Sequence, residues 1–324
     1  MADMNIAERR VPQDGRLSVS SNGQKVDLRV ATLPTVWGEK IVMRILDNST
    51  AMLDLADLGF RQVNYDRFSA SFGKPYGMIL VVGPTGSGKS TTLYATVNIL
   101  NRPEVNIITV EDPVEYRLAG VNQIQTHAKA GLTFAAALRS ILRADPDIVL
   151  IGEIRDHETA QIAVESALTG HLVLSTLHTN DAPSAVTRLI EMGIEPFLVG
   201  SSLDCVLAQR LARRLCPKCK QTYQPSREAL RAAGLPIEDG HEIPKIYRPV
   251  GCSVCSRTGY KGRVALHEVL PITERIERLA VERAPSAAIA TAGREEGMQT
   301  LKQDGLAKVL AGVTSLDEVL RVVV

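Results

Sequence analysis

One glycine-rich segment indicates the fold class of this chain: Gly83-Pro84-Thr85-Gly86-Ser87-Gly88-Lys89-Ser90-Thr91. Residues 78–82, directly before it, are all apolar, which is typical of a buried strand. Residues 92–97, directly after it, are typical of the first turns of a helix. A strand, a glycine-rich turn and a helix N-terminus in this order form the context that a phosphate-binding loop needs.

Each part of this loop has a use in binding a triphosphate. The glycines allow backbone conformations in which successive N–H groups face one anion, and the helix N-terminus adds unpaired donors and partial positive charge. We expect Lys89 to reach the β- and γ-phosphates and the Ser90 hydroxyl to bind a magnesium ion. A glycine-rich loop without a ligand is the alternative, but every position of the motif is present. The segment therefore predicts a protein that binds a nucleoside triphosphate.

Length and charge narrow the class of protein. At 324 residues the chain is longer than a usual single domain, so we expect two or three folding units. Its 37 Lys and Arg residues nearly balance its 36 Asp and Glu residues, which does not favour nucleic acid or an anionic membrane as a partner. The best candidate for a local basic patch is the set Arg210, Arg213 and Arg214. Without a membrane-length apolar run or a signal-peptide pattern, the chain is expected to be cytoplasmic.

The pattern of apolar residues predicts four parts. A strand-rich domain (1–54) is followed by a P-loop domain (55–215), a cysteine-bearing insert (216–262) and a helical C-terminal subdomain (263–324). In the first part, alternation predicts strands at 17–20, 26–30 and 40–46, with a turn at 21–23 and a loop at 33–39. This is too little chain for a well-buried β domain, so we expect its beginning to be missing.

In the P-loop domain, short apolar strands alternate with helices. The expected strands are 78–82, 106–110, 148–151 and 172–176, and the expected helices are 134–143, 158–168 and about 196–215. Such alternation is typical of an α/β fold whose mostly parallel sheet is covered on both faces. Its ligand should bind at the carboxyl ends of the strands.

Acidic residues follow two of these strands. Glu111 comes at the end of strand 106–110, and Glu153 comes just after strand 148–151. In an NTPase, acids at these positions act on the magnesium shell or on the water that attacks the γ-phosphate. The alternative for each is a helix cap or a surface carboxylate, and Asp156 is the better N-cap candidate. His178, after the next strand, is a candidate contact of the γ-phosphate, while His171 at the other end of that strand can equally be structural.

Four arginines are further candidates. Arg29 and Arg44 each lie in a β run, and Arg139 and Arg143 share one face of a predicted helix. In oligomeric NTPases an arginine from a neighbouring domain or subunit neutralises charge on the γ-phosphate. A solvated protein face is the alternative for each arginine.

Four of the five cysteines form two C-x-x-C pairs, Cys216 with Cys219 and Cys252 with Cys255. Two such turns complete a closed tetrahedral shell around zinc, and a closed shell is structural rather than catalytic. Redox dithiols are the alternative. Cys205, in the predicted helix 196–215, is left over and is expected to be a small buried apolar residue.

The order of these motifs resembles that of the secretion ATPases, the family that contains GspE of type II secretion and PilB of type IV pilus assembly. The resemblance covers nearly the whole chain. It rests on segments 12–16, 33–40, 83–91 (Walker A), 108–115 (Asp box), 145–156 (Walker B), 169–181 (His box) and 297–306, and on the four cysteines.

The resemblance implies a homohexamer of RecA-like domains that binds ATP with Mg²⁺ between the P-loop domain and the strand-rich domain. It implies that Glu111 and Glu153 are the acidic catalytic pair and that His178 is the γ-phosphate histidine. It also implies a set of phosphate-side arginines, namely Arg29, Arg44, Arg139, Arg143 and Arg263. The insert is expected to hold a structural Zn²⁺.

The resemblance further implies an ATP-hydrolysing motor at the cytoplasmic face of the inner membrane, attached through an inner-membrane platform protein. Family members normally carry an N-terminal docking domain, so we expect this chain to match a C-terminal portion. Retraction motors lack the tetracysteine insert, and residues 38–46 look more like PilB, so we predict pilus assembly. A type II secretion ATPase is the alternative. A nucleic-acid translocase on the same core and a nucleotide sensor without turnover are more distant ones.

Overall fold

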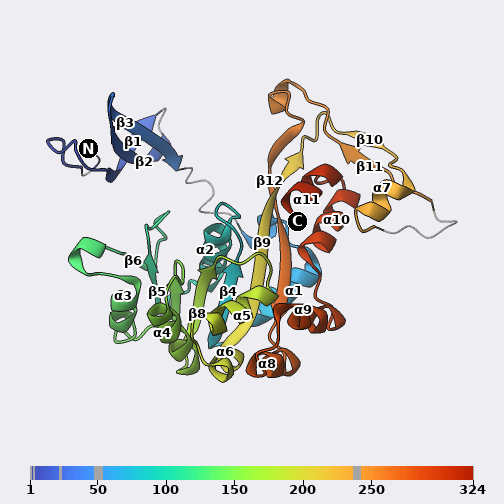
Figure 1. The fold of residues 1–324 in the computed structure, drawn as a ribbon. Helices are drawn as coiled ribbons and strands as arrows, with labels where there is room; N and C mark the ends of the chain where they lie inside the picture. Colours follow the sequence, from blue (N-terminus) through green and yellow to red (C-terminus); the bar gives the residue numbers. More distant parts are fainter. Residues whose placement is uncertain (1, 3, 22–23, 47–53, 236–241, 324) are drawn as a thin grey trace. The chain divides into compact units, whose positions relative to one another are not determined.

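The computed structural model describes residues 2, 4–21, 24–46, 54–235 and 242–323 (Figure 1). The chain divides into two compact units. The first comprises Met1–Leu53 with Glu115–Leu118, and the second comprises Asp54–Val114 with Ala119–Val324. The predicted linker around residues 53–60 begins at the border between these units. The finer division into four domains stays a prediction.

The N-terminal unit contains an antiparallel sheet of three strands in the order β1-β2-β3. These are β1 (Gln13–Ser21), β2 (Gln24–Thr35) and β3 (Gly38–Leu46). All three predicted strands are present, and each is longer than predicted. The expected loop at 33–39 is wrong, because both strands run on to a two-residue turn at 36–37. Two residues of the other predicted turn, Asn22 and Gly23, lie outside the described residues.

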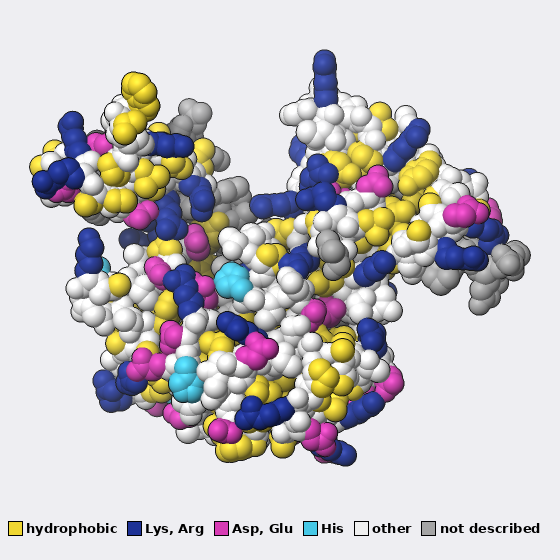
Figure 2. Space-filling model, in the orientation of Figure 1, with side chains coloured by type: hydrophobic (Ala, Val, Ile, Leu, Met, Phe, Trp, Pro, Cys, Tyr) yellow, Lys and Arg dark blue, Asp and Glu magenta, His cyan; other side chains and the backbone are white. Residues whose placement is uncertain are grey.

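One face of this small sheet is apolar. Because side chains alternate along a strand, Leu17, Leu28 and Ile45 form one cross-strand row on that face. Several apolar side chains of β3 are exposed, among them Met43 (64%) and Ile45 (70%). Figure 2 shows the corresponding hydrophobic surface over the small sheet.

The second unit is built around a seven-stranded sheet in the order β12-β9-β4-β8-β7-β5-β6. The strands are β4 (Gly77–Val82), β5 (Ile107–Glu111), β6 (Asn122–Gln125), β7 (Ile148–Ile151), β8 (Leu172–Leu177), β9 (Leu203–Leu215) and β12 (Tyr260–Pro271). All neighbours are parallel except β12, which is antiparallel to β9. Every residue of β4, β5, β7 and β8 is buried, as expected for a sheet covered on both faces. The predicted α/β class is confirmed.

Helices cover this sheet and form the C-terminal segment. The helices of the sheet region are α1 (Gln62–Phe72), α2 (Lys89–Leu100), α3 (Phe134–Ile141), α4 (His157–Leu168), α5 (Pro183–Glu191) and α6 (Pro196–Ser202). Those of the C-terminal segment are α8 (Glu274–Val281), α9 (Ser286–Glu295), α10 (Leu301–Leu310) and α11 (Leu316–Val322). Asp156 caps α4 as predicted, since its carboxylate accepts a hydrogen bond from the Thr159 N–H at 2.8 Å. Within the described residues, no helix combines the length and apolarity needed to cross a bilayer.

The predicted helix over 196–215 is wrong beyond Ser202. Residues 203–215 form β9, which pairs with β4 on one side and β12 on the other. A strand buried on both faces has no polar–apolar alternation, so its sequence resembles a buried helix. The same ambiguity hid β12, so that the C-terminal segment becomes helical only from Glu274. Cys205 therefore lies in β9; it is fully buried as predicted, and burial raises its pKa to about 12.

The cysteine-bearing insert extends from the far ends of β9 and β12 (Figure 1). Its described part contains the two-stranded sheet of β10 (Gln221–Tyr223) and β11 (Ile246–Arg248) and the short helix α7 (Arg227–Ala232). Leu230 of α7 and Ile246 of β11 are fully buried. The long gap between the two cysteine pairs therefore folds back as a small subdomain, as predicted.

His267 of β12 is a buried ionisable residue in the core of this unit. Its ring stacks on Phe60 with 3.6 Å between ring centroids, and neither ring nitrogen has a hydrogen-bond partner within the described residues. Burial, with a smaller contribution from the Lys308 cation, lowers the pKa of His267 well below 6.5. The folded protein therefore holds this imidazole neutral.

Replacing His267 by Phe should remove part of the acid sensitivity of folding. The unfolded histidine binds a proton below pH 6.5 and the folded one does not, so stability falls as the pH drops below that value, by up to about 1.4 kcal/mol per pH unit. We expect the parent protein to lose more stability between pH 7.5 and pH 5.5 than H267F, as measured by urea unfolding. The exposed His127→Asn serves as the control, and equal pH dependence of H267F and the parent would contradict this account.

Candidate functional site

The glycine-rich segment forms the turn between β4 and α2, as predicted. Gly86 and Gly88 have φ values of 78° and 88°, which L side chains rarely adopt. A Cβ atom on Gly83 would lie 2.4 Å from the Gln209 carbonyl oxygen. The Lys89 ammonium donates to the carbonyl oxygens of Gly83 at 2.9 Å and Pro84 at 3.2 Å. The loop thus has the backbone conformation and the cation of a phosphate-binding loop.

Lys89 and Glu153 influence each other electrostatically. Burial lowers the pKa of Lys89, the Glu153 carboxylate opposes this shift, and the Arg210 cation adds to it. The sheet order explains the proximity, because β7, which leads to Glu153, is separated from β4 only by β8. Ser90, the expected magnesium ligand, is the second residue of α2 and is exposed.

A chain of charged side chains links the loops after β5, β7 and β8. Glu153 forms an ion pair with Arg155, and His178 Nε2 lies 3.4 Å from Glu153 Oε2. Arg155 Nη1 also lies 3.8 Å from Asp112 Oδ2. Burial raises the pKa of Glu153, but the hydrogen bonds from Arg155 and His178 outweigh it and hold the pKa below its usual value. Sequence reasoning missed Arg155 and Asp112, although each lies within two residues of a predicted acid.

Glu111 is buried at the end of β5. Its carboxylate accepts hydrogen bonds from the hydroxyls of Tyr94 and Thr109 and from the Gln123 amide, the last two at 2.6 and 3.2 Å. Tyr94 belongs to α2, so Glu111 is tied to the helix that begins with Lys89. Sequence reasoning missed Tyr94, whose spacing from Lys89 carries no motif.

The two histidines that bracket β8 lie at opposite edges of the sheet. His178 follows the carboxyl end of β8, at the edge where the phosphate loop begins. His171 precedes β8, and its Nδ1 lies 3.0 Å from the Ser166 carbonyl oxygen. The open alternative for His171 therefore falls on the structural side, while His178 joins Glu153 at the candidate site.

In the N-terminal unit, three arginines lie opposite one another across the sheet. Arg16 of β1 faces Arg29 of β2, which faces Arg44 of β3. Like charges directly opposite each other are destabilising. Arg16 donates to the Glu115 carbonyl oxygen, and within the described residues Arg29 and Arg44 form no ion pair. Such a row of cations suits a polyanion, and Arg16 is a member that sequence reasoning missed.

The other three predicted arginines point to different partners. Arg139 of α3 forms an ion pair with Glu158 of α4, and Arg143 donates to the Arg139 carbonyl oxygen at 2.6 Å. Arg263 is exposed on β12, opposite Arg213. The contacts described for these three residues do not include the phosphate loop of their own chain, so their predicted roles stay predictions.

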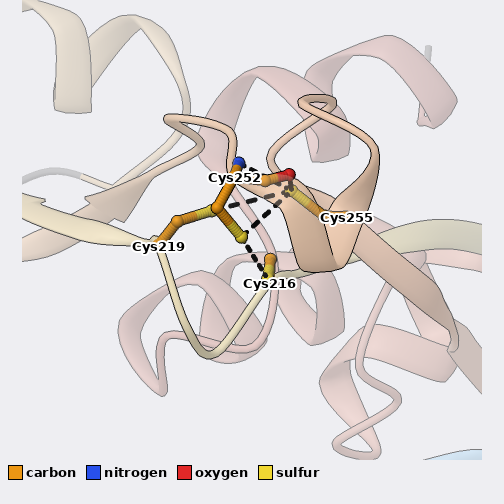
Figure 3. A group of neighbouring side chains, drawn as sticks. All are labelled: Cys216, Cys219, Cys252 and Cys255. Atoms are coloured by element: carbon orange, nitrogen blue, oxygen red, sulfur yellow. Dashed lines mark hydrogen bonds between the residues drawn. The ribbon is translucent and has the colours of Figure 1, made fainter.

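The four paired cysteines converge on one point (Figure 3). Their ligand atoms all lie within 4.8 Å of one another, and three sulfur–sulfur distances are 3.9, 3.8 and 3.7 Å. Zinc–sulfur bonds of about 2.3 Å in a tetrahedron give edges of about 3.8 Å, so the donor set fits Zn²⁺. Backbone N–H groups of Gly251 and Gly259 also donate to the sulfurs of Cys219 and Cys255. Such bonds orient metal ligands and stabilise thiolates.

Purified protein is expected to contain one zinc ion per chain, detectable by elemental analysis. Replacing Cys252 and Cys255 by Ser should abolish zinc content and speed hydrogen exchange in the insert, because the closed shell joins its two ends. Binding of MgADP should change less than twofold, since the cysteines lie outside the phosphate loop. Cys205→Ala is the control that keeps the zinc. Loss of nucleotide binding in the double variant would contradict the separation of the two sites.

Comparison with known proteins identifies the family. The family model "Type II/IV secretion system protein" matches residues 1–321. The type IV pilus assembly ATPase PilB of Myxococcus xanthus is 53% identical over 98% of this chain and 56% of its own length. The type II secretion system protein E of Aeromonas hydrophila is 50% identical over 99% of this chain and 64% of its own length.

A solved structure agrees with these sequence matches. The pilus retraction motor PilT with bound ADP has a TM-score of 0.70 and 25% identity, over 96% of this chain and 77% of that one. The chain thus spans 56% and 64% of the two sequence relatives above, and it shares its fold with a nucleotide-bound motor. On the match to nearly its whole length, the chain belongs to the type II/IV secretion system protein family.

Proposed function

We propose that this protein hydrolyses ATP to ADP and phosphate and uses the resulting movement to drive a membrane-bound assembly machine. The observation that carries the proposal is the arrangement at the carboxyl edge of the sheet. The phosphate loop, the Glu153–His178 pair and Glu111 all lie at the ends of parallel strands. The family relationship to pilus and secretion ATPases supports the same conclusion.

Each residue has a proposed part in the reaction. The backbone N–H groups of residues 83–91 and the Lys89 ammonium bind the phosphates, and Ser90 holds a magnesium ion, which neutralises charge on them. Glu153 holds the attacking water and accepts its proton, which its pKa below the usual range permits because the carboxylate is ionised at neutral pH. Glu111 supports the metal shell, and His178 contacts the γ-phosphate.

The arginines complete the site from other surfaces. Arg29 and Arg44 belong to the strand-rich domain, and the proposed closure of that domain on the phosphate loop brings their charge to the γ-phosphate. Arg139, Arg143 and Arg263 are exposed or engaged elsewhere in their own chain, which suits roles at contacts between subunits. We propose a homohexamer for this reason and because the family model covers both units.

The proposed setting is pilus assembly at the cytoplasmic face of the inner membrane, through a platform protein. The resemblance of residues 38–46 to PilB favours this setting. The second candidate is type II secretion, because protein E relatives are as similar, at 50–51% identity. Complementation of a pilus-assembly mutant and of a secretion mutant with hybrid proteins carrying this chain would separate the two settings. Strong stimulation of hydrolysis by DNA or RNA would instead support a nucleic-acid translocase.

Glu153→Gln should keep ATP binding and lose hydrolysis. An amide cannot accept the proton of the attacking water, and such a proton transfer contributes about 10²–10⁴-fold to a rate. We therefore expect kcat to fall at least about 100-fold in a phosphate-release assay, with MgATP affinity within a few-fold of the parent. Glu165→Gln, on the exposed face of α4, is the control. Turnover by E153Q at the parental rate would remove Glu153 from the mechanism, and no hydrolysis by the parent would favour a nucleotide sensor.

Arg44→Ala should lower kcat with little effect on binding of MgADP, because its charge is needed on the γ-phosphate as it leaves. Arginines in this role contribute about 10³–10⁵-fold in other NTPases, so a loss of at least about 100-fold in kcat is expected. The exposed Arg10, which pairs with Glu8, provides the control variant R10A. An R44A protein with unchanged kcat would show that the cross-strand arginine row serves another anion.

A further inference from the structure

Gln209 of β9 is a buried polar residue in contact with the phosphate loop. Only 2% of its surface is exposed. Its side-chain Nε2 donates to the Ser87 carbonyl oxygen at 2.7 Å, and its Oε1 accepts from the Thr92 hydroxyl at 2.7 Å. A carbonyl can only accept and the hydroxyl donates here, so the two bonds together define the orientation of the amide.

The backbone position of Gln209 follows from strand pairing. Strands β4 and β9 are parallel, and their last paired residues are Val82 and Ala208. Gln209 therefore lies level with Gly83, the first residue of the loop. Its carbonyl oxygen and its Nε2 lie 2.4 and 2.8 Å from the positions that Cβ atoms would occupy on Gly83 and Gly88. Two of the three loop glycines are thus packed against this one residue.

The bond to Ser87 has a consequence for anion binding. A peptide group is planar and trans, so its C=O and N–H point in opposite directions. The Ser87 carbonyl is turned toward Gln209, on the β9 side of the loop, so the N–H of Gly88 in the same peptide group points away from β9. An anion site of this kind is made by successive N–H groups that face inward.

We propose that Gln209 is a positioning residue for the nucleotide, which holds the Ser87–Gly88 peptide group with its N–H directed at the bound phosphates. This inference rests on the proposed function of the loop. Thr92 has a supporting part, because its hydroxyl keeps the Gln209 amide from rotating. A neutral residue on a neighbouring strand thereby sets the shape of the phosphate site without touching the phosphates.

Gln209→Met tests the proposal, because it keeps the volume of the side chain and removes both hydrogen bonds. We expect affinity for MgADP and MgATP, measured with a fluorescent nucleotide analogue and by competition, to fall about tenfold or more, since loss of one aligned donor and a freed loop costs about that factor. Thr92→Val should weaken binding less, by about threefold. Gln209→Glu keeps the acceptor for Thr92 but loses the donor to Ser87, and should behave like Gln209→Met.

The matched control is Asn64→Leu. Asn64 is also fully buried in this unit, donates to the His267 carbonyl oxygen at 3.1 Å and lies away from the loop, so N64L should lower the melting temperature without changing nucleotide affinity. Affinity within twofold of the parent in folded Q209M or Q209E would overturn the proposal. An equal loss of affinity in N64L would do so too, because it would show a general effect of destabilisation. Should neither Gln209 variant fold, unchanged affinity in T92V would overturn it.

Binding and hydrolysis are measured separately on the same samples. A parent protein that binds nucleotide and does not hydrolyse it would contradict the proposed function and leave the result on Gln209 standing. A parent that hydrolyses ATP together with Gln209 variants of normal affinity would contradict only the inference.

Discussion

The parallel pairing of β4 between β8 and β9 is the constraint on which the site depends. Every residue of β4 is buried, so the strand cannot shift its register without exposing apolar side chains or burying the loop. The two neighbours then place His178 on one side of the phosphate loop and Gln209 on the other. The loop itself contributes glycines and a lysine, and the strands beside it hold these residues in place.

Charge at the carboxyl edge is organised as a chain rather than as isolated pairs. Asp112, Arg155, Glu153 and His178 connect the loops after three adjacent strands, and Glu153 offsets the positive field at Lys89. A bound triphosphate adds several negative charges to this edge, so it must alter the balance within the chain. On the other side of the loop, β9 runs from Gln209 to Leu215 and is followed directly by Cys216. One strand thus connects the phosphate loop with the cysteine cluster.

Sequence reasoning was most successful where the chemistry is local. The phosphate loop, the acids at strand ends, the N-cap Asp156 and the cysteine pairs were recognised, because each is defined by residue types a few positions apart. It failed for β9 and β12, whose continuous apolar runs lack the alternation that distinguishes a strand from a buried helix. Tyr94, Arg155 and Gln209 were missed because their partners belong to other elements or, for Arg155, because a charged residue in a loop carries no signal without its neighbours.

The chain's own residues were enough to establish the fold class, the loop and the set of metal ligands, since glycine conformations, thiolate chemistry and strand–helix alternation are properties of short segments. Which of two histidines meets Glu153, which glutamine braces the loop and which three arginines stand in a row became known from the folded molecule. These contacts depend on strand order and register, and register is set by the burial of whole sheet faces, which no short segment encodes.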